Sequence, residues 1–162
     1  MTAEVLKDGG NFIVDKITEI SQLVYEKGIA PTQWTSSIII PLPKKENLEL
    51  MTNYRGISLM SIAAKVFNRV LLSRIRGPID GLLRKNQAGF RTGRSCIQQI
   101  HILRRLIEEA TTQKTPLFIF FIDFKKAFDS IDREMMFAIL RHYGIPEKIV
   151  AAIIVLYDNS LY

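Results

Sequence analysis

The chain has 162 residues, with 22 Lys and Arg against 16 Asp and Glu, and a formal net charge of +6 at pH 7. Its 48% hydrophobic content argues against a disordered chain, and its length suits one domain with a hydrophobic core. No run approaches the roughly 20 apolar residues of a membrane span, and the single cysteine, Cys96, excludes an internal disulfide. No secretory signal is visible either. The sequence therefore predicts an intracellular protein, in the nucleus or the cytoplasm, with no membrane partner.

The first elements in chain order are a helix and a strand. Apolar residues recur at helical spacing from Phe12 to Val24, and Gly28 is expected to end this helix. The run from Ser36 to Leu42 is predicted as a strand, with Pro41 and Pro43 marking its end or an edge position.

Two longer helices are predicted in the middle of the chain. Ser61 is a suitable cap for the first, and Gly77 and Pro78 are expected to stop it. Ser95 and Gln98 have the spacing of a capping box, which predicts the start of the second. Its apolar stripe comprises Ile97, Ile100, Leu103, Leu106, Ile107 and Ala110.

The last part of the chain carries a strand signal followed by two helices. The run from Leu117 to Ile122 is continuously apolar and rich in aromatics, so it is predicted to be a buried central strand. A helix is predicted from Ile131 to Tyr143, ended by Gly144. Pro146 suits the first position of a final helix, which is apolar nearly all round and therefore expected to be buried. Helices with a few separated strands predict an α+β fold.

The positive charge forms one central block. Residues 41–105 carry 13 Lys and Arg against three acids, Glu46, Glu49 and Asp80, whereas both flanking parts have a small excess of acids. Such a block attracts polyanions, of which nucleic acid is the most common. A set of solvated helix faces is the alternative interpretation.

An acid follows directly on the predicted central strand. A desolvated carboxylate at Asp123 is costly unless something neutralises it, and a divalent metal ion is a common reason in enzymes that handle nucleotides. A cap or turn residue is the alternative. Asp129 and Asp132 lie just behind it, and for both we expect capping of the next helix.

Four motifs in order are similar to those of reverse transcriptases of non-LTR (LINE-type) retrotransposons. Residues 121–132 are F-I-D-F-K-K-A-F-D-S-I-D, which resembles the first catalytic box of that family. Upstream stand W-T-S-S-I-I-I-P-L-P-K-K at 34–45, N-Y-R-G-I-S-L at 53–59 and N-Q-A-G-F-R-T-G-R-S at 86–95. The resemblance extends from about residue 3 to residue 157.

The resemblance implies the fingers and the first part of the palm of a right-hand polymerase, with an incomplete palm sheet. On this interpretation residues 1–162 are a partial reverse transcriptase domain, with about 1–115 fingers-like and about 116–162 the start of the palm. The family's Tyr-x-Asp-Asp box does not occur in these residues, so the chain alone is expected to be inactive. The implied partners of an intact parent are an RNA template, a DNA primer and dNTPs. A non-catalytic nucleic-acid-binding module and a functionless remnant are the alternatives.

The resemblance also implies roles for single residues. Asp123 and the backbone carbonyl of Phe124 would hold Mg²⁺ or Mn²⁺, once the palm is complete. Phe128 would be a steric gate against the ribose 2′-OH, with simple core packing as the alternative. Arg55 and Lys65 would bind the incoming triphosphate, although Lys65 also fits a solvated helix face.

The remaining implied contacts are with the template. Gln87, Gly89, Arg91 and Arg94 lie in a segment that joins two glycines, two arginines and a helix start. Glycines allow a nucleic-acid backbone to approach closely, and helix N-termini favour anions. These residues would hold the template backbone without reading bases. A tight turn between two helices is the alternative.

Overall fold

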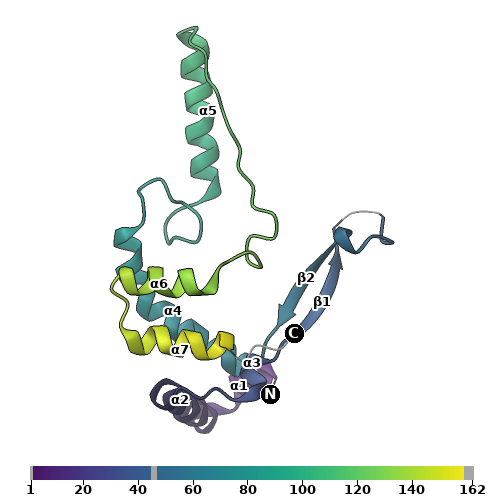
Figure 1. Cartoon of the computed structure of the whole chain (residues 1–162), viewed down its shortest axis with the longest axis vertical. Coiled ribbons are helices and arrows are strands. Elements are labelled where there is room, and N and C mark those ends of the chain that lie inside the picture. The colour runs from purple at the N-terminus through teal and green to yellow at the C-terminus, as the bar shows by residue number, and fades with distance from the viewer. Residues whose placement is uncertain (1, 45–46, 159–162) are drawn as a thin grey trace.

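The computed structural model describes residues 2–44 and 47–158, so Lys45, at the end of the upstream motif, lies outside the described residues. The chain is a mixture of helices and a small two-stranded sheet, in agreement with the predicted α+β class. The elements are α1 (Ala3–Asp8), α2 (Gly10–Lys27), α3 (Thr32–Thr35), β1 (Ile38–Pro43), the 3-10 helix η1 (Met51–Asn53), β2 (Tyr54–Leu59), α4 (Ile62–Leu82), α5 (Cys96–Thr112), α6 (Arg133–His142) and α7 (Glu147–Asp158). Helices α2, α3, α4, α6 and α7 form one helical body, from which the β1–β2 hairpin and α5 project (Figure 1).

The core of the helical body consists of two adjacent apolar clusters. One contains Val24, Trp34, Ala64, Phe67, Leu71 and Ala152, and the other contains Phe137, Ile145 and Val150. Ile149 and Ile153 of α7 pack against both clusters. The prediction that the last helix is buried is therefore confirmed for the face that joins the two clusters, whereas Ala151 on the other face is exposed.

The sheet is an antiparallel hairpin in which β1 pairs with β2. The register sets Ile38 opposite Leu59 and Pro43 opposite Tyr54. The strand predicted at residues 36–42 is confirmed with its ends moved by one or two residues, whereas β2 was not predicted. Among the described residues, strand β1 has β2 as its single neighbour, so its other edge makes no hydrogen bonds to a further strand. Prolines, which lack a backbone N–H, are tolerated in such an edge strand, as the sequence predicted.

Three local signals for helix ends are confirmed, those at Gly28, Ser61 and Ser95. Gly28 adopts a left-handed conformation (φ 65°) and its N–H donates to the Val24 carbonyl at 3.0 Å. Ser61 Oγ accepts from the Ala64 N–H at 3.2 Å. Ser95 and Gln98 form the reciprocal bonds of a capping box at 3.4 and 3.2 Å.

The predicted stop of the middle helix at Gly77 and Pro78 is wrong. Helix α4 continues through Pro78 to Leu82, although proline removes one hydrogen bond of the helix. Ile75 and Ile79, on either side of the proline, both pack against the cluster around Phe137. We attribute the extra turn to this packing, because burial of apolar surface offsets the lost hydrogen bond.

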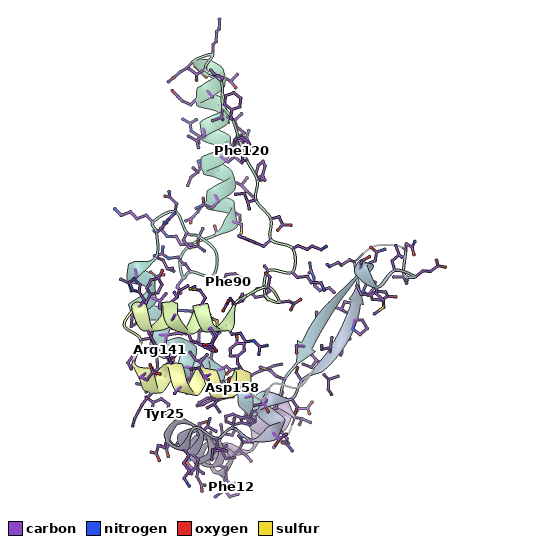
Figure 2. The ribbon with its side chains drawn as sticks, viewed as in Figure 1. Phe12, Tyr25, Phe90, Phe120, Arg141 and Asp158 are labelled. Atoms are coloured by element: carbon purple, nitrogen blue, oxygen red, sulfur yellow. The ribbon has the colours of Figure 1, made fainter. Side chains whose placement is uncertain are left out.

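The predicted buried strand from Leu117 to Ile122 is also wrong. These residues lie in an extended connection between α5 and α6 that is assigned no strand. Phe120 is 87% exposed and lies beside α5, outside the helical body (Figure 2). A strand needs a hydrogen-bonded neighbour, and the sheet found among the described residues is the β1–β2 hairpin, which does not pair with this segment.

Much apolar surface on the projecting parts is exposed. The chain exposes 13417 Å², whereas a compact protein of this mass exposes about 8,200 Å². The exposed apolar residues include the stripe of α5 at Ile97, Ile100 and Leu106. Packing energy therefore comes mainly from the helical body. Within residues 2–44 and 47–158, no helix has the length and apolar character needed to cross a membrane.

Helix α6 begins with a carboxylate cap. Asp132 accepts a hydrogen bond from the Met135 N–H at 2.9 Å, which confirms the predicted capping for Asp132. Asp129 lies in the preceding turn, where its N–H donates to the Lys126 carbonyl at 2.9 Å, so the predicted capping role is not taken by Asp129.

We expect Asp132→Ala to lower the free energy of unfolding by about 1 kcal/mol, the usual cost of losing an N-cap. Asp129→Ala is the matched control, because it removes the same carboxylate three residues away without removing the cap. Urea unfolding of both variants measures the difference. Equal losses would show that the Asp132 bond to Met135 does not stabilise α6.

Candidate functional site

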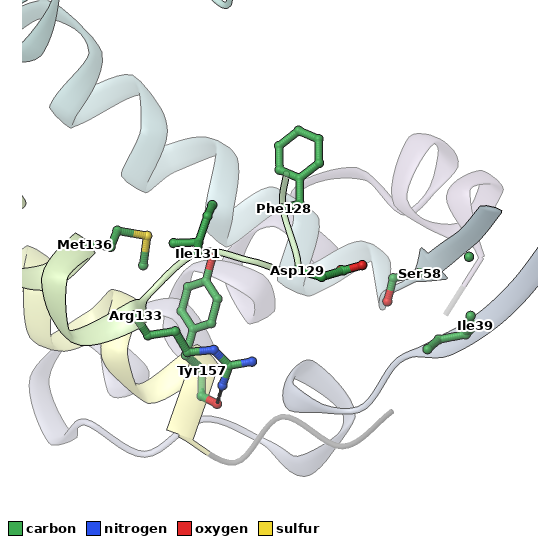
Figure 3. Close-up of a pocket in the computed structure, with 9 residues that line it drawn as sticks. Ile39, Ser58, Phe128, Asp129, Ile131, Arg133, Met136 and Tyr157 are labelled. Carbon is green, nitrogen blue, oxygen red and sulfur yellow. Dashed lines mark hydrogen bonds between the residues drawn. The ribbon is translucent and has the colours of Figure 1, made fainter. Parts of the chain in front are cut away.

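A pocket of about 540 Å³ separates the hairpin from the start of α6 (Figure 3). The hairpin contributes Ile39, Gly56 and Ser58, and the other wall contains Phe128, Asp129, Ile131, Arg133, Met136 and Tyr157. The carboxylate of Asp129 points toward the side where Ser58 lies (Figure 3). The pocket thus brings together two segments that the sequence places about 70 residues apart.

The pocket wall from α6 and α7 is held by a cation–aromatic contact. The guanidinium carbon of Arg133 lies 5.2 Å from the centre of the Tyr157 ring, and its Nη1 donates to the Tyr157 carbonyl at 3.4 Å. Such contacts typically contribute about 0.5–1 kcal/mol at exposed sites. Arg133 therefore ties the start of α6 to the end of α7 beside the pocket.

Phe128 lines the pocket, and 78% of its surface is exposed. Its ring lies 6.4 Å from the ring of Phe90 in an edge-to-face arrangement, and Phe90 itself is exposed. The exposure argues against the alternative in which Phe128 is an ordinary core residue. A bulky ring at the wall of an open pocket can restrict what enters it.

The two cations expected at the triphosphate lie on neighbouring elements. Arg55 stands in β2 opposite Leu42, next to Gly56 of the pocket wall, and Lys65 lies in the first turn of α4. Both side chains are exposed, and neither forms an ion pair with another described residue. They are available to an anion, although neither of them lines the pocket, and Arg55 alternates with Gly56 along β2 and so belongs to the other face of the strand.

Asp123 does not occupy the environment that its sequence context predicts. It is exposed, because the segment before it is not a buried strand, and the argument from a desolvated carboxylate therefore fails. Phe124 is exposed as well. Across residues 2–44 and 47–158, no three His, Cys, Asp or Glu side chains gather where they could hold a metal ion. The described residues therefore do not form a two-metal centre by themselves.

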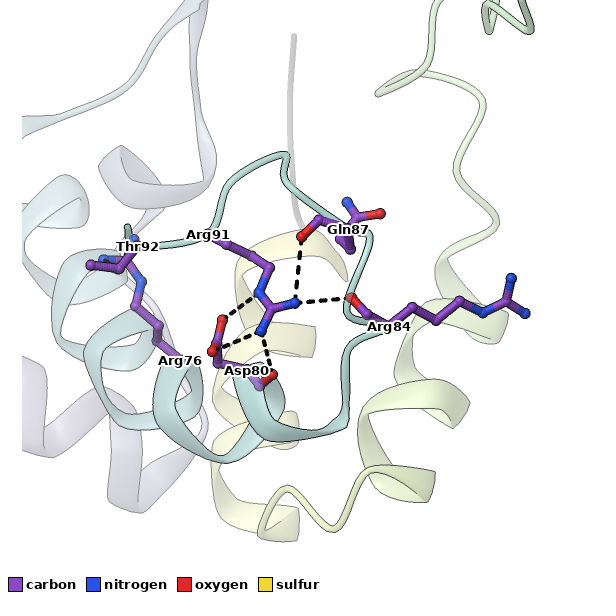
Figure 4. Close-up of polar contacts among 6 residues, drawn as sticks. All are labelled: Arg76, Asp80, Arg84, Gln87, Arg91 and Thr92. Atoms are coloured by element: carbon purple, nitrogen blue, oxygen red, sulfur yellow. Dashed lines mark hydrogen bonds and ion pairs between the residues drawn. The ribbon is translucent and has the colours of Figure 1, made fainter. Parts of the chain in front are cut away.

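The segment between α4 and α5 holds Arg91 against the end of α4 (Figure 4). Arg91 Nε and Nη2 donate to the Asp80 carboxylate at 2.7 and 2.9 Å, and Nη2 also donates to the Asp80 carbonyl at 2.9 Å. Nη1 donates to the carbonyls of Arg84 at 3.0 Å and Gln87 at 3.4 Å. Only 9% of the Arg91 side chain is exposed.

The electrostatics of this contact favour the ion pair. The hydrogen bonds from Arg91 hold the pKa of the Asp80 carboxyl below its ordinary value, and the charges of Arg91, Arg94 and Arg76 act in the same direction. The same hydrogen bonds raise the pKa of Arg91. Both groups are therefore charged at neutral pH. This role of Asp80 was not predicted from the sequence, although Asp80 is one of only three acids in a block with 13 basic residues, which was a usable signal.

The other residues expected at the template lie on the outside of this segment. Gln87, Gly89 and Arg94 are exposed, and Arg94 has no carboxylate partner among the described residues. Gly93 adopts φ 73°, a left-handed conformation that suits glycine, just before Arg94. The segment thus connects two helices, with Arg91 held against Asp80 and Arg94 exposed.

Comparisons with known proteins agree with the motifs. The family model described as reverse transcriptase (RNA-dependent DNA polymerase) matches residues 42–161. The retrovirus-related Pol polyprotein from type-1 retrotransposable element R2 of Nasonia vitripennis is 28% identical over 150 residues, covering 93% of this chain and 14% of that protein. The probable RNA-directed DNA polymerase from transposon X-element of Drosophila melanogaster is 32% identical over 119 residues, covering 71% of this chain and 13% of that protein.

A further relative extends the comparison. The probable RNA-directed DNA polymerase from transposon BS of Drosophila melanogaster is 33% identical over 104 residues, covering 62% of this chain and 12% of that protein. The chain therefore spans between 12% and 14% of the length of these three relatives.

Proposed function

This chain belongs to the reverse transcriptase (RNA-dependent DNA polymerase) family, and from that premise we propose that it is part of a polymerase that copies RNA into DNA. The reaction is the addition of dNTPs to the 3′-OH of a DNA primer on an RNA template, in the nucleus or the cytoplasm. Residues 1–115 would act as fingers and residues 116–162 as the start of the palm. The observation that carries the proposal is the pocket, which the exposed Phe128 lines on one side and the β1–β2 hairpin lines on the other through Ile39, Gly56 and Ser58.

The pocket is the proposed place of the incoming nucleotide. Phe128 would clash with a ribose 2′-OH and would therefore disfavour ribonucleotides relative to deoxynucleotides. Arg55 and Lys65 would bind the triphosphate, because phosphate chains need fixed cations and both side chains are exposed.

Asp123 is proposed as one carboxylate ligand of Mg²⁺ or Mn²⁺, with the carbonyl of Phe124 as a second oxygen donor. Both ions prefer oxygen ligands, and two-metal centres need several carboxylates at one point. The described residues bring no such group together, so the proposal requires additional carboxylates from elsewhere in the polymerase. We accordingly propose that the polypeptide of residues 1–162 does not extend a primer by itself.

The connection between α4 and α5, which carries Gln87, Gly89, Arg91 and Arg94, is proposed as the template contact. Its exposed glycine allows close approach of a nucleic-acid backbone, and Arg94 offers an exposed cation. The central basic block supports the same assignment, with 13 basic residues against three acids. This block also favours the rival function, a nucleic-acid-binding module without catalysis.

We expect the chain to bind single-stranded RNA with an affinity that falls steeply as salt rises, because each phosphate contact adds roughly 0.7 to the slope of log K against log salt. Fluorescence anisotropy of a labelled RNA at several salt concentrations measures this slope. Arg94→Ala should lower the slope by about 0.7, whereas Lys148→Ala on α7 should leave it unchanged. A salt-independent affinity, or equal effects of both variants, would contradict the proposed contact.

A further inference from the structure

The five N–H groups of the Arg91 side chain are all engaged within the chain. A guanidinium carries five N–H donors, one on Nε and two on each Nη. Two are directed at the Asp80 carboxylate, one at the Asp80 carbonyl, and two at the carbonyls of Arg84 and Gln87. A phosphate oxygen would have to displace one of these acceptors. Arg91 therefore differs from Arg94, which is exposed.

The acceptors of Arg91 lie on both sides of the place where α4 ends. Asp80 belongs to the last turn of α4, whereas Arg84 and Gln87 lie in the connection that follows Leu82. One planar side chain thus links the helix to two successive points of the connection (Figure 4). The exposed residues Gly89 and Arg94 lie in the same connection, on either side of Arg91 in the sequence. The hydrogen bonds of Arg91 therefore restrict the positions that Gly89 and Arg94 can take relative to α4.

We infer that Arg91 is a positioning residue, which together with Asp80 fixes the connection between α4 and α5 so that Arg94 can meet a nucleic-acid phosphate. The inference rests on the proposed role of this connection in template binding, and it changes the role of Arg91 from direct contact to support. Lysine cannot replace Arg91, because a single ammonium lacks the planar fork that engages a carboxylate and three carbonyls at once.

Asp80 provides a test in which the two roles predict opposite signs. Asp80→Asn removes a negative charge from the basic block and releases Arg91. If Arg91 contacted phosphate directly, both effects would strengthen RNA binding. If Arg91 positions the connection, the removed charge still favours RNA binding, but the donors of Arg91 lose their charged partner and the connection is no longer held. We then expect net weaker RNA binding.

The experiment measures RNA affinity over a salt series for the unsubstituted chain, Asp80→Asn, Arg91→Lys and Arg94→Ala, with circular dichroism to verify folding. We expect Asp80→Asn and Arg91→Lys to weaken binding several-fold with unchanged salt slopes, and the double variant to be no weaker than either single one. Arg94→Ala should instead lower the slope by roughly 0.7. Trypsin should cleave Asp80→Asn faster after Arg84 and Lys85, because the connection is released.

Each result supports or overturns the inference. Tighter RNA binding by Asp80→Asn would overturn it and make Arg91 a direct phosphate contact, as would additive losses in the double variant. Unchanged trypsin cleavage of Asp80→Asn would overturn it without reference to RNA. If the unsubstituted chain did not bind RNA, the proposed function of the connection would be overturned. Faster trypsin cleavage of Asp80→Asn in that case would still support the structural link between Arg91 and Asp80.

Discussion

Asp123→Asn should reduce primer extension by several orders of magnitude in a polymerase that contains this chain, while template binding stays nearly intact. Asparagine keeps the size of the side chain but removes the charge that a divalent ion requires of its ligand. Ion placement acts on the transition state of nucleotide addition, whereas the proposed template contacts lie between α4 and α5. Primer extension on an RNA template with Mg²⁺, beside a separate RNA-binding assay, distinguishes the two effects.

Asp8→Asn is the matched control, because Asp8 ends the first helix and lies outside the pocket. Retention of extension by Asp123→Asn would remove Asp123 from the catalytic residues. If the protein were a nucleic-acid-binding module without catalysis, neither the Asp123 protein nor the Asp123→Asn variant would extend a primer. In the chain of residues 1–162, Asp123→Asn should change the free energy of unfolding by less than about 0.5 kcal/mol, since the side chain is exposed.

Phe67→Ala should lower the free energy of unfolding by about 3–5 kcal/mol, the usual cost of removing a buried aromatic ring. Phe67 is 2% exposed in the cluster with Val24 and Leu71, and its ring lies 5.3 Å from that of Trp34. The total stability of a domain is typically about 5–15 kcal/mol, so this variant is expected to lose a large fraction of its stability. Urea unfolding followed by circular dichroism measures the loss.

Phe120→Ala makes the same chemical change on an 87% exposed ring and should cost less than about 0.5 kcal/mol. The pair of variants thus compares the helical body with the segment from Leu117 to Ile122. If Phe120→Ala were as destabilising as Phe67→Ala, this segment would be packed in solution, and the strand predicted from the sequence would be present after all.

Helix ends that depend on capping were predictable from the sequence because their physics is local. A cap at Ser61, Ser95 or Asp132 satisfies N–H groups within the next three residues, so the participants are neighbours in the chain. Gly28 ends α2 for the same kind of reason, since the left-handed conformation concerns a single residue. The family was likewise determined by the sequence, because its motifs depend on residue identity and order.

The pairing of distant residues was decided by the tertiary structure alone. Leu117 to Ile122 has the composition of a strand, yet a strand forms only where it pairs with another strand, and none of the described residues pairs with this segment. Helix α4 continues beyond Pro78 because Ile79 packs against α6 and α7. This packing cannot be predicted from the residues around the proline. Arg91 was predicted to face a template and instead binds Asp80, 11 residues earlier. The sequence determined which side chains the site contains. Only the tertiary structure decided which of them remain exposed, because groups within the chain, such as the Asp80 carboxylate, bind donors that would otherwise be free to contact a ligand.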